Sequence, residues 1–393
     1  MRVYSVGMGT LTDGAPRNRF RALTWVEVDL AAVRNNVREL IRIADRPLMA
    51  VVKANGYGHG AVEVGRAALQ AGASWLAVAR AAEGLELRAA GIREPILVLG
   101  AATPTEAQAA VSNDLSLTLY DRELGEAYAR RAAEVGRKAR VHIKIETGMG
   151  RLGILPREAA EFGRWAAGVS DFFIEGAFTH FARADEADAA PTLAQVVRFR
   201  EALDALRAAG IRPRWAHAAN SAATLWVPEA RFDMCRAGIA LYGLSPSRQI
   251  PFPASFRPAL SWKASLASGK DLPPGWGVSY GGTYVTRGSE RIGVIPVGYA
   301  DGWRRSGPNQ VLLGGVRVDI IGRVCMDFCM MPLAAEASVG DEVVLIGCQE
   351  GKCIRTEEVA ERWGTINYEV VAGIAARVPR LYRDAESSPP AGR

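Results

Sequence analysis

The chain has 393 residues, of which 49% are hydrophobic, and its formal net charge is +6. A chain of this size and composition can bury a large core, so we expect two domains or one large barrel with an addition. The basic residues are dispersed among acidic ones and form no run interleaved with aromatic residues, which argues against a nucleic-acid-binding protein. The excess charge is more typical of a solvated surface that attracts anionic substrates or cofactors.

No stretch approaches the roughly 18 consecutive apolar residues of a membrane-spanning helix. Residues 1–20 lack the apolar segment of a signal peptide, so we expect a cytoplasmic protein without a membrane partner. The five cysteines, an odd number, are then expected to be reduced thiols that pack as small hydrophobic side chains. Their closest spacings have no histidine nearby, and we expect no metal site.

Between residues 47 and 238, short apolar or β-branched runs alternate with alanine-rich stretches of helical periodicity, such as 61–72 and 192–210. Strands separated by helices of crossover length favour a parallel (β/α)8 barrel, and an open doubly wound sheet is the alternative. The candidate strands lie at 47–53, 74–79, 95–100, 115–120, 139–146, 172–180, 214–219 and 232–238.

Near residue 245 the pattern changes. The segment 245–260 contains four prolines and is typical of a linker. Beyond it, alternating apolar runs are separated by turn residues rather than helices, which predicts a mainly β domain. We therefore assign residues 1–256 to the barrel domain, with 1–23 loosely ordered, and residues 257–393 to the second domain. The early run 25–30 precedes the barrel repeat and is a candidate to pair with that second domain.

Unusual polar residues stand at the ends of several candidate strands. In a barrel of this type the active site lies at the C-terminal ends of the strands, so these residues are expected to meet at one mouth. The loops after the seventh and eighth strands, where such barrels commonly bind phosphate, offer Ser221 and the backbone around Gly238 and Ile239. The polar residues at the mouth are Lys53, His180, Asn220, Ser221 and Arg236.

Only six of the 48 basic residues are lysines, and two of them occur in candidate strands. A desolvated lysine such as Lys53 can lose its proton and form a Schiff base with a carbonyl cofactor, which an arginine cannot do; a solvent-directed strand end is the alternative. Lys144 is costly to bury as an ammonium, and a salt bridge with a neighbouring acid is its simplest explanation. Arg151, seven residues later, suits bidentate binding of a small carboxylate, or else lies on the surface.

Eight segments of the chain occur together in an order typical of one enzyme family. They are AVVKANGYGHG, VHIKIETGMGRLG, THFARADE, HAANSAATL, RAGIALYGLSP, VSYGGTY, IPVGYADGW and GRVCMD. From residue 24 to residue 383 the chain thus resembles the bacterial alanine racemases, which are pyridoxal-phosphate enzymes of barrel type. The resemblance implies a homodimer with shared active sites that interconverts L- and D-alanine and supplies D-alanine for peptidoglycan.

The resemblance also implies roles for individual residues. Lys53 would bind pyridoxal 5'-phosphate covalently and act as one of two bases, and Tyr280, delivered by the partner subunit, would be the other. Arg236 would donate a hydrogen bond to the pyridine nitrogen, with His180 packed beside it. The implied phosphate-binding residues are Tyr57, Ser221, Gly238, Ile239 and Tyr368.

Further residues are implied around the substrate. Arg151 and the backbone amide of Met326 would hold its carboxylate, and Tyr299 and Tyr368 would narrow the entrance. Lys144 resembles a lysine that is carbamylated in many members of the family, and the carbamate would face the arginine as an anion.

Two positions depart from the family pattern. Glu146 stands where aspartate is common, and we expect it to point away from the site. Asn367 stands where proline is common, directly before Tyr368, and could alter the strictness of the preference for alanine.

Three other functions are weighed against this one. An amino-acid decarboxylase of the same fold would be expected to have an acid where this chain has Arg236. A non-catalytic pyridoxal-phosphate homeostasis protein would resemble the barrel alone and would lack residues 257–383 with Tyr280. A broader-specificity or serine racemase is the third alternative, since pocket size cannot be read from the sequence.

Overall fold

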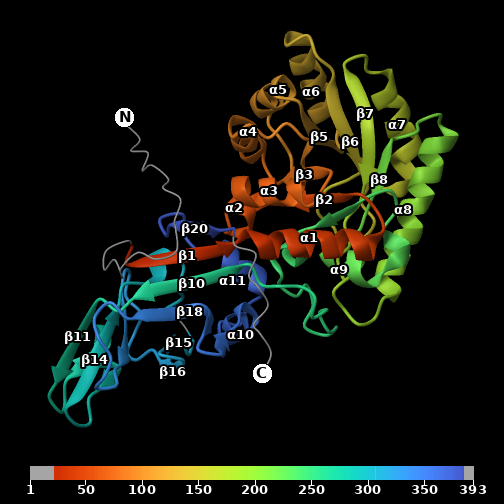
Figure 1. Cartoon of the computed structure of the whole chain (residues 1–393). Helices are drawn as coiled ribbons and strands as arrows, with labels where there is room; N and C mark the ends of the chain where they lie inside the picture. The colour runs from red at the N-terminus through yellow and green to blue at the C-terminus, as the bar shows by residue number, and fades with distance from the viewer. Residues whose placement is uncertain (1–21, 306, 385–393) are drawn as a thin grey trace.

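The computed structural model describes residues 22–305 and 307–384, and its first part is a closed parallel barrel surrounded by helices (Figure 1). The eight-stranded sheet has the order β8-β7-β6-β5-β4-β3-β2-β9, and a parallel bridge between His217 and Met234 joins its two ends. The predicted barrel is therefore confirmed, and the open doubly wound sheet is wrong. The strands are β2 (Leu48–Val51), β3 (Trp75–Val78), β4 (Ile96–Val98), β5 (Leu115–Leu119), β6 (Ala139–Lys144), β7 (Phe172–Phe178), β8 (Trp215–His217) and β9 (Cys235–Ala237).

The helices around the barrel begin and pack as their sequences dictate. In α1, Asp29 caps the first turn by accepting the N–H of Ala32 at 2.9 Å, and the helix buries Val33, Val37 and Leu40, which lie on one face. The barrel helices are α1 (Leu30–Ala44), α3 (Ala61–Gln70), α4 (Ala81–Ala89), α5 (Pro104–Ser112), α6 (Arg122–Glu134), α7 (Ala159–Gly168), α8 (Ala190–Ala208) and α9 (Ser221–Trp226). Short 3-10 turns are η1 (Pro156–Glu158), η2 (Pro228–Ala230) and η3 (Ile239–Tyr242).

The second part of the chain is mainly β. Its largest sheet has the order β16-β15-β18-β10-β1-β20, with β19 paired to β18, and two smaller sheets have the orders β11-β14-β17 and β12-β13. Strand β1 (Thr24–Asp29) belongs to this sheet, where it pairs with β10 and β20 although it precedes the barrel in sequence.

The remaining elements are β10 (Leu260–Ser265), β11 (Ser268–Leu272), β12 (Gly277–Val278), η4 (Tyr280–Gly282), β13 (Tyr284–Val285), β14 (Glu290–Ile295), η5 (Tyr299–Asp301), β15 (Gln310–Leu313), β16 (Val316–Asp319), β17 (Cys329–Pro332), β18 (Glu342–Gln349), β19 (Lys352–Ile354), α10 (Thr356–Arg362), α11 (Asn367–Ala372) and β20 (Arg380–Arg383).

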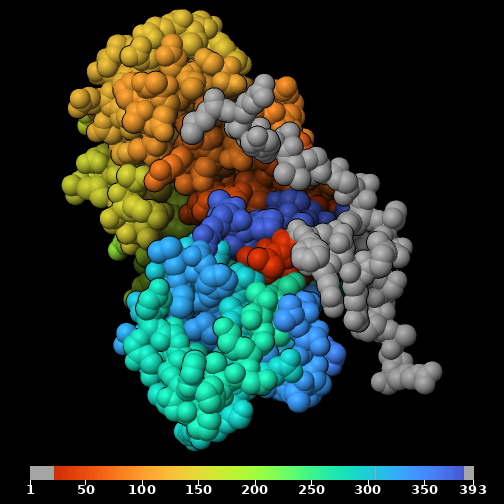
Figure 2. Space-filling view, turned by 90° about the vertical axis from the view of Figure 1, so that its left-hand side faces the viewer, coloured from red at the N-terminus to blue at the C-terminus, as the bar shows by residue number. Residues whose placement is uncertain are grey.

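The two parts meet beside the loop that follows β2. Arg380 donates a hydrogen bond to the carbonyl of Gly58 at 3.0 Å. A Cβ atom on Gly60 would lie only 1.9 Å from the hydroxyl of Tyr382, so only glycine allows this close approach. In Figure 2 the barrel and the β domain form two lobes, and residues near the C-terminal end of the chain lie between them. The β domain therefore braces the loop behind Lys53.

The cysteines differ from what the sequence predicts. Cys348 and Cys353 form a disulfide, so the expectation that all cysteines are reduced is wrong; they are directly paired residues of the β18–β19 hairpin, with Cα atoms 4.0 Å apart. Cys235 and Cys329 are buried free thiols. Residues 1–21, most of the segment expected to be loosely ordered, lie outside the described residues.

Among residues 22–305 and 307–384, no helix is long and apolar enough to cross a membrane. The same residues contain no group of three or more His, Cys, Asp or Glu side chains that could hold a metal ion.

Candidate active site

A cavity of about 640 Å³ lies at the carboxyl ends of the barrel strands and extends beneath α11 of the β domain. Its walls bring together residues from strands and loops that are far apart in the sequence, as a barrel mouth requires. Of the residues singled out in the sequence, the following line it: Lys53, Tyr57, Lys144, Arg151, His180, Asn220, Ser221, Arg236, Gly238, Ile239 and Tyr368.

Lys53 lies on an unusual turn at the edge of this cavity. The segment labelled α2 (Lys53–Tyr57) is left-handed, because Ala54, Asn55, Gly56 and Tyr57 have φ values of 52°, 52°, 59° and 51°. A left-handed conformation costs a non-glycine residue about 1–2 kcal/mol, so the surrounding contacts must hold this turn. Burial and the charge of Arg151 lower the pKa of the Lys53 amine, which favours the neutral, nucleophilic form.

One corner of the cavity is built to receive an anion. The hydroxyl oxygen of Ser221 accepts the backbone N–H groups of Gly238 at 2.9 Å and Ala240 at 3.3 Å. Its own proton is therefore available to donate into the cavity. The Tyr57 hydroxyl packs so closely over Gly238 that a Cβ atom there would lie 2.4 Å from it. The hydroxyl groups of Ser221 and Tyr57 thus lie around Gly238, and the one carboxylate residue among the cavity-lining residues, Glu369, is paired with Arg304.

Arg236 is buried and is fixed by four acceptors. Its Nη1 contacts His217 Nδ1 at 2.9 Å, and its Nη2 donates to the carbonyls of Thr179 at 2.7 Å and Ala218 at 2.9 Å. His180 Nδ1 lies 3.3 Å from the same Nη2. Burial lowers the pKa of Arg236 to about 10 and holds the pKa values of both histidines well below their usual range. Both imidazoles are therefore neutral and can accept from the guanidinium.

A chain of polar groups continues from Arg236 through the inside of the barrel. His217 Nε2 contacts His142 Nδ1 at 2.9 Å, and His142 Nε2 lies 3.5 Å from Glu175. Gly176 makes room for His142, since a Cβ atom there would lie 2.3 Å from its Nδ1. Burial opposes ionisation of Glu175, but hydrogen bonds from its neighbours outweigh it and lower its pKa to about 2.

Lys144 is buried beneath the cavity. In the described residues its ammonium has no ion-pair partner; it donates to the carbonyl of Ile145 at 2.9 Å and lies 5.2 Å from the centre of the Phe178 ring. The salt bridge that would explain it simply is therefore wrong. Burial, together with the charges of Arg236 and Arg151, lowers its pKa to about 7. A substantial fraction of this amine is neutral near pH 7.

Glu146 organises the loop that carries Arg151. Its carboxylate accepts the backbone N–H groups of Gly148, of Met149 at 2.6 Å and of Arg151 at 3.2 Å. It is not among the cavity-lining residues, in keeping with the expected orientation away from the site. Its effect on the site is indirect, through the position of the arginine.

Tyr368 enters the cavity from α11, and Asn367 ties that helix to the barrel. The Asn367 amide donates to the carbonyl of Ser245 at 2.8 Å and to Glu357 at 2.9 Å. The ring of Tyr368 lies 6.1 Å from that of Tyr57, centre to centre. The asparagine therefore helps to position the aromatic wall of the cavity.

Three expected site residues do not line this cavity in the single chain. Tyr280, Met326 and Tyr299 belong to the β domain and are 65%, 53% and 43% exposed. Tyr280 follows Ser279, which has a φ of 64° and donates through its hydroxyl to the carbonyl of Arg323 at 2.5 Å. Exposed tyrosine and methionine side chains on braced loops are typical of a contact surface.

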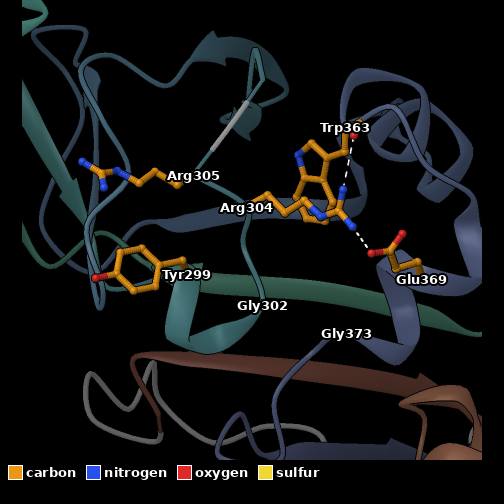
Figure 3. A pocket seen from close by; sticks show the side chains of 7 residues that line it. All are labelled: Tyr299, Gly302, Arg304, Arg305, Trp363, Glu369 and Gly373. Carbon is orange, nitrogen blue, oxygen red and sulfur yellow. Dashed lines mark hydrogen bonds and ion pairs between the residues drawn. The ribbon is translucent and has the colours of Figure 1, made fainter.

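Tyr299 lines a different cavity, of about 490 Å³, within the β domain (Figure 3). In that view Arg304 lies against the Trp363 ring and pairs with Glu369, whereas Tyr299 lies apart from this group. The charge of Arg304 is thus neutralised within the chain.

Several residues that shape the site were not singled out in the sequence. Glu175 and His217 are the polar residues of β7 and β8, and this interruption is the signal that could have found them; His142 lies between Arg140 and Lys144 in β6 and stands out less. Glu83, which contacts the turn after Lys53, carries no such signal, because a glutamate in the first turn of a helix is common as part of a cap.

The fold and the cavity define a class of protein: a two-domain barrel enzyme with its active site at the carboxyl mouth of the strands. A family model described as alanine racemase, N-terminal domain, matches residues 28–246, and one described as alanine racemase, C-terminal domain, matches residues 259–382. The alanine racemase of Symbiobacterium thermophilum is 50% identical over 364 residues, which cover 91% of this chain and 97% of the relative.

Solved structures agree. The alanine racemase from the D-cycloserine producer Streptomyces lavendulae has a TM-score of 0.88 and 40% identity, over 93% of this chain and 98% of that chain. The alanine racemase from Bacillus anthracis with bound L-Ala-P has a TM-score of 0.87 and 43% identity, over 94% and 96%. The chain belongs to the alanine racemase family and is an enzyme of the isomerase class. The resemblance read from the sequence is confirmed.

Proposed function

We propose that this enzyme is a pyridoxal-phosphate-dependent alanine racemase that interconverts L- and D-alanine by proton transfer from two sides. The observation that carries the proposal is the cavity itself, in which a depressed-pKa lysine faces the same space as the anion corner and the buried Arg236. The names of the relatives and solved structures support alanine as the substrate.

The residues present fit the cofactor. The Ser221 hydroxyl, the Tyr57 hydroxyl and the backbone around Gly238 and Ile239 would bind its phosphate, because these groups converge as donors in one corner. Arg236 would face the pyridine nitrogen, and since a guanidinium does not give up a proton, that nitrogen would stay unprotonated. Tyr368 would complete the phosphate site from α11, and His180 would support the arginine.

The bound cofactor would acidify the Cα–H of an amino acid attached to it. Lys53 would remove or return the proton on one face, and Tyr280 of a second copy would do so on the other. Supply by a second copy is supported by the exposure of Tyr280, Met326 and Tyr299 outside the cavity of their own chain. The protein would therefore act as a homodimer with shared sites, in which Tyr299 and Tyr368 narrow the entrance.

Arg151 would orient the substrate carboxylate together with the Met326 backbone amide of the second copy. Lys144 would act on Arg151 as a carbamate, and its partly neutral amine is the form that reacts with carbon dioxide. An anion there would replace a repulsive contact between cations with an attractive one.

In the cell we propose that the product, D-alanine, is used for peptidoglycan, and a cytoplasmic location stays a prediction. A broader-specificity or serine racemase would use the same machinery, and Asn367 is the residue that bears on this choice. A non-catalytic homeostasis protein is disfavoured because the match includes the C-terminal domain at residues 259–382.

The test is reconstitution followed by chiral analysis. We expect the protein loaded with pyridoxal phosphate to be yellow, and hydride reduction followed by peptide mapping to find the cofactor on Lys53. We expect L-alanine in deuterated water to give racemic, Cα-deuterated alanine without release of carbon dioxide. Tyr280→Phe should impair exchange from one enantiomer much more than from the other. Release of carbon dioxide, or equal loss for both enantiomers, would contradict the proposal.

A further inference from the structure

Glu83 of helix α4 links two neighbouring units of the barrel. One of its carboxylate oxygens accepts the backbone N–H of Ala54 at 2.6 Å. The other accepts the N–H groups of Ala79 at 2.7 Å and Arg80 at 3.0 Å. Ala54 directly follows Lys53, whereas Ala79 and Arg80 lead into α4, so one side chain joins the end of β2 to the end of β3.

The hydrogen bonds of Glu83 at the start of α4 are explained by helix capping. A glutamate at the third position of a helix commonly accepts the N–H of the capping residue, and Glu83 does so with Arg80. Capping does not explain the second oxygen. That oxygen accepts the N–H of Ala54, which is the first residue of the left-handed turn and directly follows Lys53.

We propose that Glu83 is a positioning residue for Lys53: its carboxylate holds the left-handed turn against the start of α4 and so directs the lysine amine into the cavity. This inference rests on the proposed role of Lys53 and deepens it. Glu83 is not among the residues that line the cavity, so it acts through the backbone and through its charge.

The turn needs such a partner. At its far end the turn is held by Arg380 of the β domain, which donates to the Gly58 carbonyl at 3.0 Å. Other backbone bonds of the turn are local, as in Gly58 N–H to the Ala54 carbonyl at 3.0 Å and Gly60 N–H to the Asn55 carbonyl at 2.8 Å. Local bonds alone do not fix a turn relative to the neighbouring strand. The bond from Ala54 to Glu83 does so, and a bond to a charged acceptor is stronger than one to a neutral carbonyl.

The charge of Glu83 has a second consequence. Burial and Arg151 both disfavour the ammonium form of Lys53, and Glu83 is the charge that opposes them. Removing this carboxylate charge while keeping the fold is therefore expected to lower the pKa of the lysine amine further. Lasting unfolding of the turn would expose the amine and raise its pKa instead, whereas brief openings that speed hydrogen exchange leave the amine buried on average.

The experiment uses the full-length protein without cofactor, so that it does not depend on racemase activity. Glu83→Gln has a single acceptor oxygen, so it can serve the helix cap or Ala54 but not both; we expect the oxygen to stay with the cap, which offers two N–H groups, and the NH2 group then faces Ala54 and cannot accept from it. Glu83→Ala loses both contacts, and Glu86→Gln, on the exposed side of the same helix, is the matched control. Hydrogen exchange of peptides 53–60 and 79–89 is measured in each variant. The pH midpoint of Lys53 acylation is measured by mass spectrometry.

For Glu83→Gln we expect exchange in 53–60 to become about tenfold faster, as for loss of one charge-assisted hydrogen bond, with 79–89 unchanged. The Lys53 midpoint should move to lower pH. Glu83→Ala should accelerate exchange in both peptides, and Glu86→Gln should match the wild type. Unchanged exchange in 53–60, or an unchanged or raised midpoint in Glu83→Gln, would overturn the inference.

The result is separate from the proposed function. If Glu83→Gln behaves as expected but reduction does not place the cofactor on Lys53, the positioning role of Glu83 is supported and the proposed function is contradicted. If the cofactor is found on Lys53 but exchange in 53–60 does not change, the proposed function is supported and the positioning role of Glu83 is contradicted.

Discussion

The barrel mouth and the exposed surface of the β domain differ in how they present polar groups. At the mouth, Arg236 and Ser221 are buried and held by several partners each. On the β domain, Tyr280 and Met326 are mostly exposed, and only the backbone that carries them is braced. Burial shifts the pKa of the barrel groups within one chain, whereas in the proposed homodimer the surroundings of Tyr280 would be completed by the second copy. One chain would therefore supply the proposed cofactor site, and two chains would be needed for the proposed two-sided proton transfer.

The largest expected effect tests this division directly. Lys53→Ala and Tyr280→Phe should each be nearly inactive alone, since a positioned acid or base contributes about 10²–10⁴-fold. Refolded together and isolated as heterodimers, they should recover up to about half of wild-type activity, because each heterodimer contains one intact site of two; the unfractionated mixture, in which half of the random dimers are heterodimers, should recover about a quarter. Activity is measured after heterodimers have been isolated with two different tags.

The control mixes each variant with itself, which should recover nothing. If isolated heterodimers are as inactive as the parent variants, lysine and tyrosine do not meet across two subunits. The barrel mouth of one subunit and the β domain of the other would then not form a common active site.

The next effect concerns the interior of the barrel. His217→Leu removes the neutral acceptor of Arg236 and leaves a buried guanidinium donor unsatisfied. We expect cofactor dissociation to become about tenfold faster, since an unsatisfied buried partner costs about 1–3 kcal/mol. Dissociation is followed by the loss of visible absorbance on dilution. His217→Gln, which retains an acceptor, should restore most of the affinity, and equal behaviour of both variants would show that the hydrogen bond is unimportant.

The sequence predicted the barrel side of this comparison best. Apolar runs identify each barrel strand, and the rule for barrel mouths predicts from the sequence alone that Lys53, Ser221 and Arg236 lie together. These inferences depend only on strand direction and order. The surface position of Tyr280 could not be obtained in this way, because it depends on loop geometry.

What the sequence missed depends on side-chain direction and register. Cys348 and Cys353 are joined because they are opposed in a hairpin, and their spacing alone does not reveal that register. His142 fits beside Gly176 only because two parallel strands are aligned, and the left-handed turn after Lys53 contains three non-glycine residues. Such features follow from tertiary contacts that outweigh local preference.

Lys144 offers a prediction about pH and stability. Its folded pKa of about 7 lies below the usual value for lysine, so in the range between the two the unfolded chain binds more protons. Stability then rises with pH across that range, and the penalty for burying Lys144 is largest at and below pH 7. In degassed, bicarbonate-free buffer, Lys144→Met should therefore be more stable than the wild type, by a few kcal/mol at most near pH 7, since one pKa unit corresponds to about 1.4 kcal/mol.

The advantage of Lys144→Met should shrink as the pH rises toward 10 and also when bicarbonate is added, because a carbamate would pair with Arg151. Urea unfolding at several pH values measures both trends. An advantage that grows with pH would contradict the lowered pKa, and a lack of response to bicarbonate would contradict the proposed carbamate.

The smallest expected effect lies where the two regions meet. Asn367→Ala removes the hydrogen bond that ties α11 to Ser245 of the barrel and the one that ties it to Glu357 of α10, and leaves the start of α11, next to Tyr368, freer to move. Each bond is worth about 0.5–1.5 kcal/mol, so we expect a stability loss of that order and a severalfold smaller preference for alanine over serine, with kcat for alanine little changed.

Asn367→Pro is the informative companion variant, because proline suits the first position of a helix but also lacks the two hydrogen bonds. If the proline variant keeps the wild-type preference and the alanine variant does not, the rigid start of α11 controls selectivity rather than the bonds to Ser245 and Glu357. If neither variant alters the preference for alanine over serine, contacts with barrel residues such as Tyr57 are enough to position Tyr368. The β domain would then contribute to selectivity only through the second copy.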